Sequence, residues 1–109
     1  MANTYKVLGQ SNPTANTNTT LYTVPANTST VLSTISVANL GASTTYRIAI
    51  RPGGAAIANQ HYIVFNASLN AAETQYHTVG ISLATTDVVT VWNNTGGSVA
   101  FNAYGTEIT

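Results

Sequence analysis

Short runs in which apolar and polar residues alternate are the feature that most constrains the fold of this chain. In the clearest run, 44–51, Tyr46, Ile48 and Ile50 alternate with polar or small residues. Successive side chains of a strand point to opposite faces, so this period of two predicts a strand with one buried face. Pro52 and the two glycines after it end the run, because proline lacks the N–H that a β-ladder needs and glycine favours turns.

The same pattern, rich in β-branched and aromatic residues, recurs along the chain and predicts seven or eight short strands. Besides 44–51, the expected strands are 21–24, 30–38, 61–69, 75–83, 88–92 and 99–104, with a possible further one at 5–8. Asn, Gly, Pro and Thr fill the breaks between them. The segment 53–60 is too short and too rich in glycine for more than a loop or a single turn. We therefore expect an all-β fold, a single antiparallel β-sandwich of jelly-roll or Ig-like type.

The chain of 109 residues has the length of one domain. Its segment 10–20 (QSNPTANTNTT) is polar and of low complexity, with little apolar surface to offset the entropy lost on ordering. We expect residues 1–20 to form an N-terminal strand and an extended polar arm that reaches a neighbour, and residues 21–109 to form the sandwich.

Charged residues are scarce and exclude several kinds of partner. They make up 6% of the chain against about 25% in an ordinary soluble domain. This scarcity predicts a protein that packs against a partner rather than one that remains a monomer. With a net charge of zero and three cations, nucleic acid and anionic membranes are poor partners. No apolar run approaches the ~20 residues of a membrane helix, and the first residues lack the pattern of a cleaved signal peptide. We expect synthesis in a cytoplasm.

Arg47 and Arg51 are the first candidate interface residues. They share one face of their predicted strand, and a guanidinium group can bind a carboxylate of a neighbouring chain bidentately. The alternative is that both arginines only solubilise a hydrated face. The carboxylates that could pair with them, within or between chains, are Glu73, Asp87 and Glu107.

His61, Tyr62, Tyr76 and His77 complete the candidate interface. The pairs His61–Tyr62 and Tyr76–His77 are expected to form two amphipathic patches on one sheet, and tyrosine is enriched at protein interfaces. The alternative is that both tyrosines pack in the core or at its rim. The two histidines match no metal-ligand spacing, and we assign no metal site and no cofactor.

No catalytic residue is assigned, because the sequence contains neither a Gly-x-Ser-x-Gly elbow nor a phosphate-binding P-loop. The protein is therefore not expected to be an enzyme.

Trp92 is the single tryptophan. We expect it to be a core anchor of the sandwich, with a sugar-stacking residue as the alternative.

Four stretches carry a resemblance to a known class of protein. They are LYTVPANT (21–28), TYRIAIRP (45–52), LATTDVVTV (83–91) and FNAYGTEI (101–108). Together they resemble small virion structural proteins of tailed bacteriophages, including phages of cyanobacteria. The resemblance implies an all-β component of the virion, assembled in the host cytoplasm, such as a capsid decoration (cement) protein or a neck, tail or fibre component.

The expected partners are further copies of the chain, in a homo-oligomer that we expect to be a trimer, and the major capsid protein or neighbouring virion proteins. A small glycan-binding β-sandwich module is the alternative from another functional class. Exposed aromatic residues around a groove would favour glycan binding, whereas a large Thr-rich and apolar surface would favour assembly.

Overall fold

The computed structural model describes residues 2–109 and contains eight strands. They are β1 (Asn3–Ser11), β2 (Thr19–Thr23), β3 (Ser29–Asn39), β4 (Thr44–Arg51), β5 (Tyr62–Leu69), β6 (Thr74–Leu83), β7 (Val88–Asn93) and β8 (Val99–Ile108). Two short 3-10 turns, η1 (Pro52–Gly54) and η2 (Asn59–His61), lie between β4 and β5. The predicted strands are confirmed, including the possible one at 5–8, although β1 and β8 extend further than the alternation indicated.

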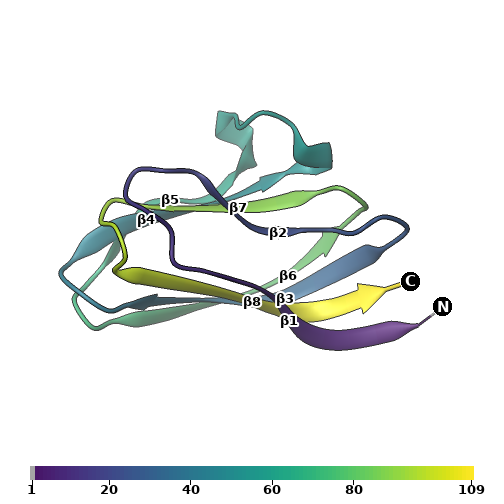
Figure 1. Cartoon of the computed structure of the whole chain (residues 1–109), viewed down its shortest axis with the longest axis horizontal. Helices are drawn as coiled ribbons and strands as arrows, with labels where there is room; N and C mark the ends of the chain where they lie inside the picture. Colours follow the sequence, from purple (N-terminus) through teal and green to yellow (C-terminus); the bar gives the residue numbers. More distant parts are fainter. Residues whose placement is uncertain (1) are drawn as a thin grey trace.

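The strands form two four-stranded antiparallel sheets that pack face to face (Figure 1). The first sheet has the order β1-β8-β3-β6 and the second the order β2-β7-β4-β5. Strands pair from both ends of the chain inward, β1 with β8, β2 with β7, β3 with β6 and β4 with β5. A long hairpin rolled up in this way is a jelly roll, which decides between the two expected types of sandwich.

The N-terminal segment is part of the sandwich rather than an arm outside it. β1 pairs with β8 over its whole length, from Asn3 opposite Ile108 to Ser11 opposite Phe101. The polar residues that follow cross from the first sheet to the second, where β2 begins at Thr19. This crossing is held by Asn93, whose carbonyl oxygen accepts a hydrogen bond from Asn16 N at 2.8 Å. The expected boundary at residue 20 therefore falls within β2.

The core lies between the sheets and consists of the inward half of each alternating run. Its members are mostly aliphatic and come from both sheets, among them Leu32, Ile35, Val37, Ile48, Val89, Val91 and Phe101, all 0–1% exposed. Full burial of such a side chain contributes about 1.5–3 kcal/mol. Two glycines let backbones approach closely: a Cβ on Gly9 would collide with the carbonyl oxygen of Leu21, and one on Gly105 with that of Val31.

Candidate functional site

The outer face of the second sheet carries a stack of aromatic rings around Arg47. The Arg47 guanidinium carbon lies 3.8 Å from the centre of the Trp92 ring and 4.3 Å from that of Phe65. Arg47 Nε also donates a hydrogen bond of 2.7 Å to Asn66 Oδ1. The Tyr62 ring meets the edge of Phe65, with centroids 4.9 Å apart. Cation–π contacts with two rings and the bond to Asn66 hold this guanidinium in one orientation. We call Trp92, Arg47, Phe65 and Tyr62 the arginine stack.

Register explains how these residues meet. Arg47 on β4 lies directly opposite Trp92 on β7, and β5 supplies the two remaining rings from the other side of β4. Val89 and Val91 of β7 point into the core, so the period of two sends Trp92 outward. The expectation that Trp92 anchors the core is therefore wrong; its ring is half-buried beside a guanidinium.

Arg51 lies on the same outer face, as the sequence predicted, but away from the rings. Its Nε donates to Thr90 Oγ1 at 3.0 Å and its Nη1 to the carbonyl oxygens of Gly54 and Ala55 at 3.3 and 2.9 Å. Arg51 thus fastens the 52–61 loop to the sheet. The loop, teal in Figure 1, rises from the layer formed by the second sheet.

Two surface hollows are lined in part by residues of this loop. One, of about 400 Å³, is lined by Asn59, Tyr62 and Phe65. The other, of about 270 Å³, is lined by the loop residue Ile57, by Arg51 and by three polar residues, Asn18, Thr20 and Thr90. The first hollow therefore borders the arginine stack, and the second borders the other guanidinium.

His77 contributes to a partly buried bridge between the sheets rather than to an exposed patch. Its Nε2 lies 2.6 Å from the hydroxyl of the fully buried Tyr46, which donates to Gln75 Oε1 at 2.5 Å. The Tyr46 hydroxyl uses its single proton in the bond to Gln75, so His77 Nε2–H is the donor in the bond between His77 and Tyr46. Burial raises the pKa of Tyr46 above 10.0, and the negative charge of Glu73 adds to the shift. This bridge ties β4 of the second sheet to β6 of the first.

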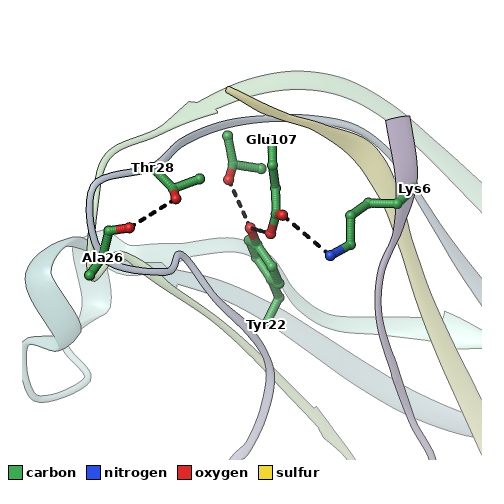
Figure 2. Close-up of polar contacts among 6 residues, drawn as sticks. Lys6, Tyr22, Ala26, Thr28 and Glu107 are labelled. Carbon is green, nitrogen blue, oxygen red and sulfur yellow. Dashed lines mark hydrogen bonds and ion pairs between the residues drawn. The ribbon is translucent and has the colours of Figure 1, made fainter. Parts of the chain in front are cut away.

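A second polar bridge joins the sheets near both chain ends (Figure 2). The Tyr22 hydroxyl donates to Glu107 Oε2 at 2.6 Å and lies 2.8 Å from Thr30 Oγ1. Lys6 Nζ donates to the other carboxylate oxygen at 3.2 Å. Burial and the bond to Glu107 raise the pKa of Tyr22 to about 12. The bond from Tyr22, together with the Lys6 ammonium, lowers the pKa of Glu107.

None of the three carboxylates pairs with an arginine; in residues 2–109 the one ion pair is Lys6–Glu107. Asp87 instead accepts backbone N–H bonds from Gly53 and Ala84, at 2.8 and 2.9 Å. Glu73 accepts one from Asn70 at 2.7 Å. The chain therefore uses its own acids to close turns and to join sheets, and leaves both guanidinium charges without a carboxylate partner.

The outer face of the first sheet differs from that of the second. Five exposed apolar or tyrosine side chains lie on it, Tyr5, Val7, Val31, Tyr76 and Tyr104. Thr34, Ser36 and Asn102 lie among them by register. The charged side chains of these four fully described strands, Lys6 and Glu107, point to the opposite side, where Glu107 meets Tyr22 of the second sheet. We call this surface the tyrosine face.

The predicted interface residues are thus divided between the two sheets. Tyr76 is 71% exposed on β6 of the first sheet, whereas Tyr62 lies on β5 of the second. His61 ends η2, where its Nδ1 accepts a hydrogen bond of 3.1 Å from Ala58 N. The expectation that the two His–Tyr pairs share one sheet is wrong, because the 70–73 turn leads the chain from one sheet to the other.

Sequence reasoning did not single out Phe65, the most exposed ring of the arginine stack at 56%. Its position in the run YIVF gives no alternation signal, because all four residues of the run are apolar or aromatic. The contact with Arg47 depends on the pairing of β4 with β5, which local sequence does not determine.

Neither a protein-family model nor a curated protein matches this sequence. Among residues 2–109, no three His, Cys, Asp or Glu side chains are grouped so that they could hold a metal ion. The same part of the chain contains no helix of the length and hydropathy needed to cross a membrane.

Proposed function

We propose that this chain is a non-enzymatic structural protein of a bacteriophage virion, a capsid decoration (cement) protein that binds copies of itself and the shell beneath. The tyrosine face is the observation that carries the proposal. Tyr5 and Tyr76 are 80% and 71% exposed, and Val7, Val31 and Tyr104 add apolar area between them. Isolated exposed apolar residues are ordinary, but a group of them on one sheet face marks an interaction surface.

The chemistry of this face suits contacts between identical crowded subunits. Its hydroxyl and amide groups form hydrogen bonds at a lower desolvation cost than charged groups. Tyrosine combines apolar area with a polar tip and is enriched in interfaces. Because the four strands place no charge on the face, two copies that meet there do not repel each other.

Fold-level analogy and the four resembling stretches support the virion assignment. Double-sheet jelly rolls with two Greek keys occur in viral capsid domains and also in lectins. A fold hosts many functions, so this analogy adds to the argument from the face and does not replace it. A neck, tail or fibre component of the same virion would use the same surface in fewer copies.

Self-association is tested by sedimentation equilibrium of the purified protein. We expect a trimer of 11.3-kDa chains. The double variant Tyr76→Glu/Tyr104→Glu places two charges on the tyrosine face and should shift the protein to monomer. Leu40→Glu is the matched control, because Leu40 is 71% exposed in the loop after β3. A wild-type monomer at all concentrations, or a double variant that associates like wild type, would contradict the proposed face.

The place in the virion is tested by quantitative mass spectrometry of purified particles, as copies of this chain per copy of the major capsid protein. A ratio that matches the capsid lattice supports a decoration protein. A few copies per particle would move the chain to the neck, tail or fibre. Its absence from particles would refute the virion proposal.

A further inference from the structure

The arginine stack has the composition of a ligand-binding surface, on the sheet face opposite to the tyrosine face. Its Phe65 ring is 56% exposed, and its guanidinium is fixed by Trp92 and by Asn66. A side chain that is already ordered loses little entropy when it binds a ligand. The stack therefore offers a pre-oriented cation beside an exposed aromatic ring.

The adjoining hollow adds space and a hydrogen-bonding group. Its volume of about 400 Å³ falls within the range of small-molecule sites, about 300–1,000 Å³. Tyr62 and Phe65 supply its apolar lining, and Asn59 of the loop supplies an amide that can both donate and accept. One side of the hollow thus suits an apolar surface, and its rim suits hydroxyl groups.

Charge indicates that the ligand is an acid from outside this chain. Arg47 makes one hydrogen bond, through Nε, and no ion pair within residues 2–109. A guanidinium is matched in geometry to a carboxylate. The carboxylates of a second copy are poor candidates, because Glu73, Asp87 and Glu107 each accept hydrogen bonds within their own chain.

We propose that this hollow binds an acidic saccharide, a sugar ring that carries a carboxylate. The C–H face of the ring packs on Phe65 and Tyr62, and its hydroxyls bond to Asn59. Its carboxylate reaches past the Phe65 ring to Arg47, which does not itself line the hollow and whose guanidinium carbon lies 4.3 Å from the centre of that ring. An acidic peptide also supplies a carboxylate, but it has no rigid ring with one apolar face and hydroxyls at its edge. The inference does not depend on the proposed assembly, which uses the other sheet.

The binding experiment uses the fluorescence of Trp92, the single tryptophan, which touches Arg47. The probes are the trimers of galacturonic, mannuronic and glucuronic acid, the methyl ester of the first, and a tri-glutamate peptide. We expect saturable binding of at least one uronic acid trimer. We also expect the methyl ester of the galacturonate trimer to bind more weakly than the trimer itself, because the ester keeps the sugar ring and loses the charge. Absence of binding by all three trimers up to about 10 mM, equivalent to less than about 3 kcal/mol, would overturn the proposal.

Two variants test the location of the site. Phe65→Ala removes an exposed ring without opening the core and should weaken binding at least tenfold. Leu40→Ala removes an exposed apolar side chain from the loop after β3, outside both surfaces, and should leave the affinity unchanged. Equal losses in both variants, wild-type affinity in Phe65→Ala, or binding of tri-glutamate in preference to the sugars would overturn the proposal. The oligomeric state of Phe65→Ala should match wild type, which separates this result from the assembly experiment.

Discussion

Replacement of Tyr22 by phenylalanine tests how far one hydroxyl stabilises the contact between the two sheets. In the wild-type protein this hydroxyl donates to Glu107 and lies 2.8 Å from Thr30 Oγ1. Tyr22→Phe keeps the ring, which is 7% exposed, and removes only the oxygen. It leaves the Glu107 carboxylate, whose side chain is 13% exposed, with Lys6 as its remaining partner.

A hydrogen bond to a charged group contributes about 1.5–3 kcal/mol, and the lost contact with the buried Thr30 hydroxyl adds to the cost. We expect the variant to unfold with a free energy about 2 kcal/mol lower at pH 7. At about 4 °C per kcal/mol for a domain of this size, the Tm should fall by roughly 8 °C. Urea titration followed by Trp92 fluorescence measures the difference as a lower midpoint at an unchanged m-value.

The difference in the free energy of unfolding between wild type and Tyr22→Phe should shrink toward both low and high pH. The pKa of Glu107 is lowered in the folded state, so its contribution is present above 4.5 and is lost as the pH falls through the folded pKa. The pKa of Tyr22 is raised from 10.0 to about 12, so its contribution is complete below pH 10 and is lost as the pH rises toward 12. The difference in the free energy of unfolding should be largest in the pH range between the protonation of Glu107 and the ionisation of Tyr22.

Tyr5→Phe is the control, because Tyr5 is 80% exposed and its hydroxyl has no hydrogen bond within residues 2–109. It should unfold like wild type at every pH. A Tyr22→Phe protein as stable as wild type at pH 7, or a gap that stays constant from pH 3 to pH 12, would refute the assigned role of this bridge.

Three further variants, at two positions, test features of the backbone. Gly105→Ala should lower the free energy of unfolding by about 3 kcal/mol or more in urea titration, because its Cβ would collide with the carbonyl oxygen of Val31; wild-type stability would contradict the close approach of these strands. Asp87→Ala should cost about 1–2 kcal/mol, because the N–H groups of Gly53 and Ala84 lose their acceptor, and Asp87→Asn, which keeps one oxygen, should lose about half as much in thermal unfolding. Equal losses in the alanine and asparagine variants would mean that the charge, not the pair of hydrogen bonds, is responsible.

Local sequence determined the strands and their breaks. The alternation of Tyr46, Ile48 and Ile50 with small or polar residues, ended by Pro52, predicted β4 with the bounds that the structure has. The reason is that a strand's period of two and a turn's need for Gly, Pro or Asn act over a few neighbouring residues. The same local rule placed Arg47 and Arg51 on one face.

Tertiary structure decided which strands share a sheet and what the exposed side chains meet. Tyr62 and Tyr76 lie in similar runs but on different sheets, and the 12–18 segment is a crossing rather than an arm, because pairing joins strands from opposite ends of the chain. Trp92 points outward because Val89 and Val91 point inward, a choice that the run VVTVW (88–92) left open, since apolar residues occupy both of its faces. The arginine stack and the Tyr22–Glu107 bridge both join residues far apart in sequence, so the pairing and packing of the sheets created them.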